Sequence, residues 1–309
     1  MRVVLCGGTG FVGRHFMRRL LDEGHEVAVL TRHPGQYRAE QGITYSGWDS
    51  LASGPRVFER SDAVINLAGE SLAGGRWTRA RRERLLLSRT ASTGAIVEAM
   101  RTAAHPPPVL LNISAVGFYG DTGTEIVTEQ HEAGRGFLAE VCLAWEAAAL
   151  KAVDLGIRVV IPRMGVVLGR PGGALDTMAL LFRVFLGGTP GSGAQYVPWI
   201  HLDDAVDAAL FSLRDGTMRG PVNLVAPESV TMREFSRALG SALHRPSLLP
   251  VPAFVLRGLL GEMAVMILAS QRVTPSALIR NGFRFRFPSL QEALRSLFGN
   301  KEPRPALKT

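Results

Sequence analysis

Cysteine is nearly absent from this 309-residue sequence, which contains only Cys6 and Cys142. Two cysteines provide neither a disulfide framework nor a metal-binding cluster. The N-terminus runs directly into a strand-like stretch and a glycine loop, so we expect no signal peptide. Uninterrupted apolar runs of membrane-spanning length are also missing, because the longest candidate, residues 252–270, contains Arg257 and Glu262. These absences predict a reduced, cytoplasmic protein without a bound metal.

Acidic residues are the scarcer charge, with 27 Asp and Glu against 35 Lys and Arg, which gives a formal net charge of +8 at pH 7. Much of the basic charge is Arg and is dense in residues 76–89, where the simplest interpretation is the solvated face of a helix. A basic balance is compatible with a nucleic acid, a membrane surface or an anionic ligand. No nucleic-acid recognition motif is present. We therefore expect a small-molecule partner, no nucleic acid and no membrane, with a monomer and a homodimer both left open.

Short apolar runs alternate with amphipathic stretches through the first half of the sequence. Predicted strands cover residues 2–7, 26–32, 43–48, 62–69, 109–117 and 157–163. Predicted helices cover residues 11–24, about 77–104 and about 137–156, and the prolines at 105–108 end the second of them. Strands that alternate with helices form a parallel sheet with right-handed crossovers. The predicted fold class is α/β, a Rossmann-type doubly wound sheet with a smaller C-terminal α/β lobe.

The alternation loosens after about residue 164, which predicts a division into two parts. Residues 1–165 form the predicted dinucleotide-binding domain, to which elements from about 196–226 return, and residues 166–298 form most of a substrate lobe. In this second half we expect loops at 171–175 and 187–195, a helix at 231–244, one or two buried helices within 252–270, a hairpin-like 282–288 and a helix at 289–298. The polar tail at 299–309 is expected to be disordered.

A glycine loop, GGTGFVG at residues 7–13, follows the first strand and opens the first helix. In this context Gly7 permits a tight turn, Gly10 allows close approach of a pyrophosphate, and Gly13 allows the helix to pack on the strand. The free N–H groups at the helix N-terminus favour phosphate binding. The alternative is a glycine turn needed only for packing. The predicted cofactor contacts in this loop are Gly7, Thr9, Gly10, Phe11, Val12 and Gly13.

The end of the second strand indicates which dinucleotide binds. An NAD-binding chain usually carries an acidic residue there, whereas this sequence has Thr31 and Arg32. A guanidinium pairs with a 2′-phosphate, whereas a carboxylate would repel it. NADP is therefore predicted, with Arg32 binding the 2′-phosphate. A surface Arg in a turn is the alternative for Arg32, and a helix cap is the alternative for Asp49, which we expect near the adenine. Small residues at the end of the fourth strand are expected to lie against the ribose: Leu67, Ala68 and Gly69.

A wider set of motifs resembles a known family. The glycine loop, NLAG at 66–69, Ser114 with the following Tyr119 and Gly120, and PWIHLDD at 198–204 look like an extended short-chain dehydrogenase/reductase. NLAGESLAGGRW, SAVGFYGD, GPVNLVAP and GFRF resemble more closely the atypical, epimerase-like "epimerase family protein" group with a C-terminal domain of unknown function. The resemblance spans about residues 1–298. It implies a Rossmann fold, a small substrate lobe and NADP, without an established substrate or reaction.

The resemblance also defines a departure from the ordinary enzymes. Their proton donor is a Tyr, and a Lys one helical turn later lowers its pKa and binds the nicotinamide ribose. Aligning Glu146 with the Glu that commonly follows this Lys places Leu138 and Cys142 at the two positions. Arg89 stands where the preceding helix usually has an Asn, and we expect it to hold cofactor phosphate or ribose. The usual catalytic pair is therefore missing.

Three residues remain as catalytic candidates. Ser114 is expected over the nicotinamide, where its hydroxyl can polarise a carbonyl, and a strand-end cap is its alternative. Tyr119 is a substitute acid if a cation lowers its pKa, with Arg89 as the nearest plausible one, and a loop anchor is its alternative. Cys142 can act as an acid or nucleophile if its pKa is depressed, and otherwise it is a small core residue.

Other strand-end residues complete the predicted site. Arg163 and Val167 follow the sixth strand, where the backbone normally meets the nicotinamide, and we expect both to contact the cofactor. Asp203 and Asp204 are expected to cap the next helix.

Two functions are compatible with these features. The first is an NADP-dependent oxidoreductase or epimerase-like enzyme with an unconventional proton donor, acting on a sugar nucleotide or another anionic metabolite. The second is a non-catalytic NADP(H)-binding sensor or scaffold. The full substrate lobe favours the first and the missing Tyr and Lys favour the second, because a fold alone does not decide.

Overall fold

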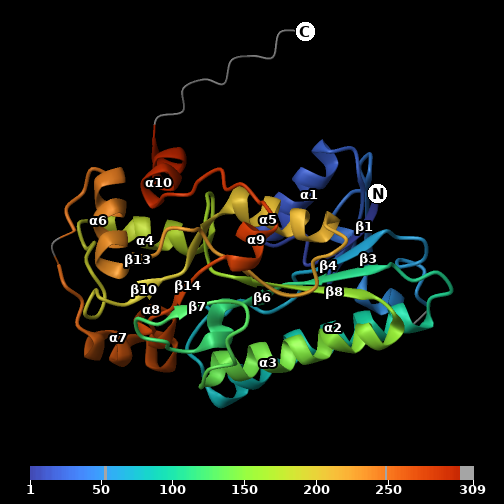
Figure 1. The fold of residues 1–309 in the computed structure, drawn as a ribbon, viewed down its shortest axis with the longest axis horizontal. Helices are drawn as coiled ribbons and strands as arrows, with labels where there is room; N and C mark the ends of the chain where they lie inside the picture. Colours follow the sequence, from blue (N-terminus) through green and yellow to red (C-terminus); the bar gives the residue numbers. More distant parts are fainter. Residues whose placement is uncertain (52–53, 248, 300–309) are drawn as a thin grey trace, which may run out of the picture.

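A computed structural model describes residues 1–51, 54–247 and 249–299. Within these residues the main sheet has eight parallel strands, seven of them in the order β12–β8–β5–β4–β1–β2–β3, with β6 paired to β8 (Figure 1). The strands are β1 (Arg2–Cys6), β2 (Glu26–Thr31), β3 (Ile43–Gly47), β4 (Ala63–Asn66), β5 (Val109–Asn112), β6 (Ser114–Ala115), β8 (Arg158–Met164) and β12 (Gly220–Leu224). Strand order leads away from β1 in both directions, which confirms the predicted doubly wound fold.

Helices cover both faces of this sheet because successive strand residues point to opposite faces. Val3 and Leu5 pack with side chains of α1 (Phe11–Asp22) and α5 (Leu202–Arg214). Val4 and Cys6 pack on the opposite face with side chains of α2 (Arg79–Thr102) and α3 (Phe137–Leu150). All four strand residues are fully buried. Cys6 is therefore a core residue, as its place within the first strand implies.

The C-terminal lobe has its own apolar core, formed by α4 (Gly173–Arg183), α6 (Met232–Ala242) and α10 (Leu290–Phe298) around the buried Trp199 and Phe235. Thr231 starts α6 with a capping box, in which its side chain and that of Glu234 bond each other's backbone N–H. The shorter elements are β7 (Ile126–Val127), β9 (Val166–Leu168), β10 (Tyr196–Val197), β11 (Trp199–His201), β13 (Val230–Thr231), α7 (Ala253–Leu260), α8 (Val265–Leu268), β14 (Arg272–Val273) and α9 (Ser276–Arg280).

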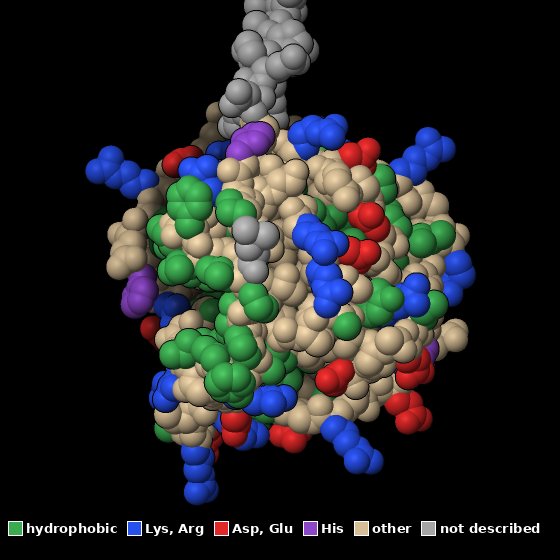
Figure 2. Space-filling model, turned by 90° about the vertical axis from the view of Figure 1, so that its left-hand side faces the viewer, with side chains coloured by type: hydrophobic (Ala, Val, Ile, Leu, Met, Phe, Trp, Pro, Cys, Tyr) green, Lys and Arg blue, Asp and Glu red, His purple; other side chains and the backbone are tan. Residues whose placement is uncertain are grey.

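The helices expected within residues 252–270 do form, but the prediction that they are buried is wrong. Phe254 and Leu259 of α7 are 74% and 65% exposed, and α8 also contains no buried residue. Figure 2 shows hydrophobic side chains on the surface of this end of the molecule, interspersed with Lys and Arg. None of the helices that the structure describes has the length and apolarity to cross a membrane.

Three local predictions in the second half need correction. The expected loop at 171–175 already contains the first turn of α4, which begins at Gly173. The expected hairpin at 282–288 contains no strand, because the N–H groups of Arg286 and Phe287 donate to the buried carboxylate of Asp204 at 2.8 and 2.9 Å instead of to a partner strand. The helix cap expected from the two aspartates is supplied by His201, whose Nδ1 accepts the N–H of Asp203.

Boundaries in the first half differ from the prediction in small ways. The fifth predicted strand divides at Ile113 into β5 and β6, although Ile113 still donates its N–H to the carbonyl of Asn66 at the end of β4. The helix predicted over 137–156 ends as α3 at Leu150 and continues as a 3-10 helix over Lys151–Leu155. Apart from Gly299, the tail expected to be disordered lies outside the described residues.

Candidate functional site

The glycine loop and the N-terminus of α1 form an open cradle at the carboxyl end of β1. Gly7 has a φ of +79°, and a Cβ on Gly13 would lie 2.3 Å from the carbonyl oxygen of Gly7, so neither position accepts a side chain without displacement. Gly10 is exposed and begins α1 without a side-chain cap. The first intrahelical bond runs from Arg14 N–H to the Gly10 carbonyl, so the amides of residues 11–13 have no earlier helical partner. This geometry fits a phosphate group.

The neighbouring strands bring the other predicted cofactor residues to this edge of the sheet. A Cβ on Gly7 would lie 2.9 Å from the carbonyl group of Leu67, so the segment 67–69 borders the glycine loop directly. Thr31 is the buried last residue of β2, and Arg32 follows it on the exposed surface. Asp49 is also exposed, within a 3-10 helix over Trp48–Leu51 after β3. Thr31, Arg32 and Asp49 thus follow strands that end on the same side of the sheet as β1, and their contact with a cofactor stays a prediction.

A buried amide network supports the ends of β4 and β5 and was missed by sequence reasoning. Asn66 donates to Asn112 at 2.6 Å and to Thr93 at 3.0 Å, and its own Oδ1 accepts the N–H of Ala68. Trp145 of α3 donates to the same Thr93 hydroxyl at 3.0 Å. The sequence signal was a single Asn within each of two apolar strands. The network fixes the backbone at Ala68, where the cofactor ribose is expected.

The α3 positions that correspond to the missing Tyr and Lys face the segment after β6. A Cβ on Gly117 would lie 3.2 Å from the Cβ of Leu138, and the Cys142 thiol donates to the Ala115 carbonyl at 3.6 Å. Cys142 is 4% exposed, and burial, reinforced by the nearby Glu146 carboxylate, raises the pKa of its thiol to about 11. The depressed pKa that a nucleophilic or acidic Cys142 requires is therefore not provided.

Ser114 and Tyr119 belong to one buried polar chain. Ser114 donates its hydroxyl to Glu146 at 2.6 Å, and Glu146 forms a bidentate ion pair with Arg163 at 2.8 and 3.0 Å. Arg163 also donates to the Tyr119 hydroxyl at 3.0 Å, which in turn donates to Asn223 at 2.7 Å. Pairing of β6, β8 and β12 aligns Ser114, Arg163 and Asn223 across the sheet. The proton of each hydroxyl is thus held by a protein acceptor.

The cation expected beside Tyr119 is a different residue from the one predicted. Arg163 contacts the phenol, whereas the Arg89 guanidinium donates to the carbonyls of Leu85 and Glu70, so the assignment of Arg89 to this role is wrong. Burial raises the pKa of Tyr119, and the charge of Arg163 opposes that rise. Arg163 itself lies inside β8, 4% exposed, with its guanidinium on Glu146 and Tyr119. Its predicted cofactor contact would have to compete with these partners.

The remaining predicted cofactor residues lie on either side of the strand ends. Val167 is half-buried in β9 and pairs with Ile200 of β11. Arg89 is 8% exposed, and a Cβ on Gly69 would lie 3.2 Å from its Cζ. Burial lowers the pKa of Arg89, and its guanidinium stacks over the Trp145 ring at 5.2 Å. Arg89, in α2, thus contacts Gly69 and donates a hydrogen bond to the backbone carbonyl of Glu70.

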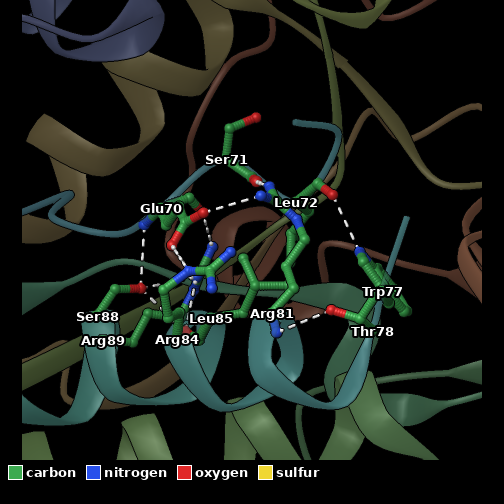
Figure 3. Close-up of polar contacts among 10 residues, drawn as sticks. All are labelled: Glu70, Ser71, Leu72, Trp77, Thr78, Arg81, Arg84, Leu85, Ser88 and Arg89. Carbon is green, nitrogen blue, oxygen red and sulfur yellow. Dashed lines mark hydrogen bonds and ion pairs between the residues drawn. The ribbon is translucent and has the colours of Figure 1, made fainter. Parts of the chain in front are cut away.

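The Arg-rich segment 76–89 is more than a solvated helix face. Arg81 and Arg84 lie beside Glu70, and Trp77 donates its indole N–H to the Leu72 carbonyl (Figure 3). Arg76 donates to the carbonyl of Leu259 at the end of α7. Arg82 forms an ion pair with Glu262 at 3.0 Å. The segment therefore joins the sheet to the C-terminal lobe. The prediction of a solvated face holds for the exposed Arg79 and Arg84 but is wrong for Arg81, whose side chain is 12% exposed.

A doubly wound parallel sheet with a glycine loop between β1 and α1 defines a Rossmann-type, dinucleotide-binding class of protein. A family model described as the NAD dependent epimerase/dehydratase family matches residues 3–224, and a domain of unknown function, DUF1731, matches residues 251–297. The chain belongs to the NAD dependent epimerase/dehydratase family. The family resemblance read from the sequence motifs is thereby confirmed.

Similar proteins cover almost the whole chain. The sequence is 38% identical over 301 residues to epimerase family protein SDR39U1 of Mus musculus, covering 96% of this chain and 99% of the relative. It is 35% identical over 304 residues to epimerase family protein YfhF of Bacillus subtilis, covering 98% and 99%. The crystal structure of human epimerase family protein SDR39U1 (isoform2) with NADPH superposes with a TM-score of 0.88 at 35% identity, covering 97% of this chain and 100% of the human chain.

Proposed function

We propose that this chain binds NADP(H) at the glycine cradle and uses it in an oxidoreductase or epimerase-like reaction on a small molecule. The observation that supports binding is the cradle at Gly10, where α1 begins without a side-chain cap and a Cβ would meet only the Gly7 carbonyl oxygen, at 3.4 Å. Arg32, exposed at the end of β2, supports the choice of NADP(H) over NAD(H). The crystal structure of the human relative with NADPH agrees with this proposal.

The roles of the chain's own residues follow from these positions. Backbone N–H groups of residues 11–13 would hold the pyrophosphate, Arg32 the 2′-phosphate, and the segment 67–69 the ribose. When bound, the cofactor supplies or accepts a hydride. The C-terminal lobe, joined to the sheet through Arg76 and Arg82, supports a substrate site because it lies beyond the carboxyl ends of the strands (Figure 1). The substrate stays unassigned by the fold alone.

A second candidate function is favoured by a specific observation. Ser114, Tyr119 and Cys142 are 1%, 2% and 4% exposed, and each donates its hydrogen to a protein acceptor. A proton donor must reach its substrate within hydrogen-bond distance. This arrangement supports a protein that binds NADP(H) without turnover, a sensor or scaffold, in which the three residues serve only the structure.

One experiment separates the two functions. Purified protein is loaded with NADPH deuterated at the transferable position, binding is verified by fluorescence, and a cell metabolite extract is added. Mass spectrometry then searches for deuterium in each metabolite. Deuterium in one product class establishes hydride transfer. Loss of that label in the Tyr119→Phe variant shows that the buried polar chain takes part in the reaction. Tight binding with no label in any metabolite overturns the enzyme proposal and leaves the sensor.

The cofactor assignment has its own control. Arg32→Ala should weaken NADPH binding much more than NADH binding, because the guanidinium is expected to contact only the 2′-phosphate. The neighbouring variant His33→Ala, which keeps the positive charge of Arg32, should leave the preference unchanged. Equal loss for both cofactors, or no loss for either, would make the NADP assignment wrong.

A further inference from the structure

The segment 69–78, between β4 and α2, carries a carboxylate enclosed by arginines. Glu70 pairs with Arg81 at 3.0 Å and with Arg84 at 3.8 Å, and its backbone carbonyl accepts from Arg89 at 3.0 Å (Figure 3). These four residues hold three positive charges and one negative charge, so the net charge of the set is +2, and the Glu70 carboxylate contacts only Arg81 and Arg84. A second anionic group would therefore be attracted to this position.

The side chain of Arg81 is largely buried and is held by the protein rather than extended into solvent. Its side chain is 12% exposed, and its Nη2 donates to the Ser71 carbonyl at 2.8 Å. A Cβ on Gly74 would lie 2.6 Å from the same nitrogen, so the loop closes tightly over the guanidinium. Its Nε is buried and has no hydrogen-bond partner among the described residues. A buried donor without a partner costs about 1–3 kcal/mol. The Nη1 group faces the Glu70 carboxylate, and an oxyanion with several acceptor atoms would take the place of that carboxylate.

The position of this cluster is that of a ligand site in a doubly wound fold. It follows Gly69 at the carboxyl end of β4, next to the predicted cofactor surface. Trp77 packs edge-on against Phe137 at the start of α3, one residue before Leu138, which occupies the missing Tyr position. On its other side, Arg76 bonds the end of α7 in the C-terminal lobe. Ligands of open α/β sheets bind outside the carboxyl ends of the strands, where this cluster lies.

We propose that Arg81 and Arg84 form the binding site for an oxyanion group of the substrate, a phosphate or a carboxylate, and that Glu70 occupies this site when the substrate is absent. This inference rests on the proposed function, since it takes the region beside the predicted cofactor surface as the substrate site. Planar guanidinium groups bind both kinds of oxyanion through paired N–H donors. Glu70 is 31% exposed and lies in a loop, so it can leave without disrupting a core.

The test measures anion binding to the NADPH-saturated protein by isothermal titration calorimetry at constant ionic strength. Inorganic pyrophosphate and malonate are the two probes. Glu70→Gln should bind at least one of them about 10-fold or more tightly than the unaltered protein, because the internal competitor has lost its charge. The variant Arg81→Gln should abolish binding of both probes. The matched control is Arg79→Gln, which removes an exposed charge from the same helix and should leave binding unchanged within about twofold.

The outcomes divide clearly. A larger gain with pyrophosphate assigns a phosphoryl group, a larger gain with malonate assigns a carboxylate, and equal gains support the oxyanion class as a whole. A Glu70→Gln protein that binds no more tightly than the original overturns the proposal, and misfolding cannot imitate the expected gain. Arg81→Gln behaving like Arg79→Gln overturns it as well. NADPH binding and deuterium transfer are measured separately, so a failure of the anion site is distinguishable from a failure of the proposed function.

Discussion

Replacing Glu146 by Gln tests the buried polar chain most directly. Its carboxylate and the Arg163 guanidinium are joined by two hydrogen bonds of 2.8 and 3.0 Å, with side chains only 7% and 5% exposed. Gln keeps an oxygen that can accept from Ser114 but removes the negative charge. The guanidinium is then buried without compensation, which costs about 3–5 kcal/mol. Since whole domains are stable by about 5–15 kcal/mol, Glu146→Gln should lower stability severely.

Urea unfolding followed by circular dichroism measures this loss. The matched control is Glu98→Gln, which breaks the exposed pair with Arg101 and should cause no measurable loss. The double variant Glu146→Gln with Arg163→Met should be more stable than Glu146→Gln alone, because it removes the uncompensated charge. A loss below about 1 kcal/mol for Glu146→Gln, or a double variant less stable than the single one, would refute the claim that the pair is buried and mutually dependent.

Three further predictions concern a titration, a thiol and a turn. Burial lowers the pKa of His201 to about 4, so between that value and the unfolded pKa of about 6.5 the unfolded chain binds more protons. Stability is therefore lost as pH falls from about 6.5 to 4, by about 3 kcal/mol for one such group, and a pH series of urea unfolding should flatten in this window for His201→Gln. Cys142, with a pKa of about 11, should resist iodoacetamide at pH 8 until urea unfolds the chain, and rapid labelling of the native protein in mass spectrometry would contradict its burial. Gly13→Ala should abolish NADPH binding because its Cβ would overlap the Gly7 carbonyl, whereas Gly35→Ala, where a Cβ meets nothing within 4 Å, should retain binding by fluorescence titration.

Local sequence signals predicted the first half well. The glycine loop, the strand before it and the helix after it all lie where the pattern placed them, because β1 is buried on both faces and α1 presents one apolar stripe. The loop positions 7–13 follow from steric rules that act within a few residues. Capping, hydrophobic period and glycine conformation are local properties, so the sequence is enough to predict them.

The polar partners of Tyr119 and of the Arg-rich segment could not be predicted in the same way. Arg163 is 44 residues beyond Tyr119 in the chain, and Asn223 is 104 residues beyond it. The sequence favoured Arg89 as the nearby cation because the register between strands, which places Arg163 beside Tyr119, is not contained in a local pattern. Pairing of β6, β8 and β12 decides which side chains are neighbours, and each strand must first find its place in the sheet.

The sequence by itself determined the class of fold, the glycine cradle and the absence of the Tyr and Lys pair, since these depend on residue identity and short spacing. The tertiary structure decided the rest. It buried Ser114 and Tyr119 in a chain of hydrogen bonds, and it joined the segment 70–78 to α7 across about 180 residues of sequence. It also exposed the apolar face of α7, which the sequence suggested was core. Burial and charge pairing between distant segments depend on how the whole chain packs, and no local pattern encodes them.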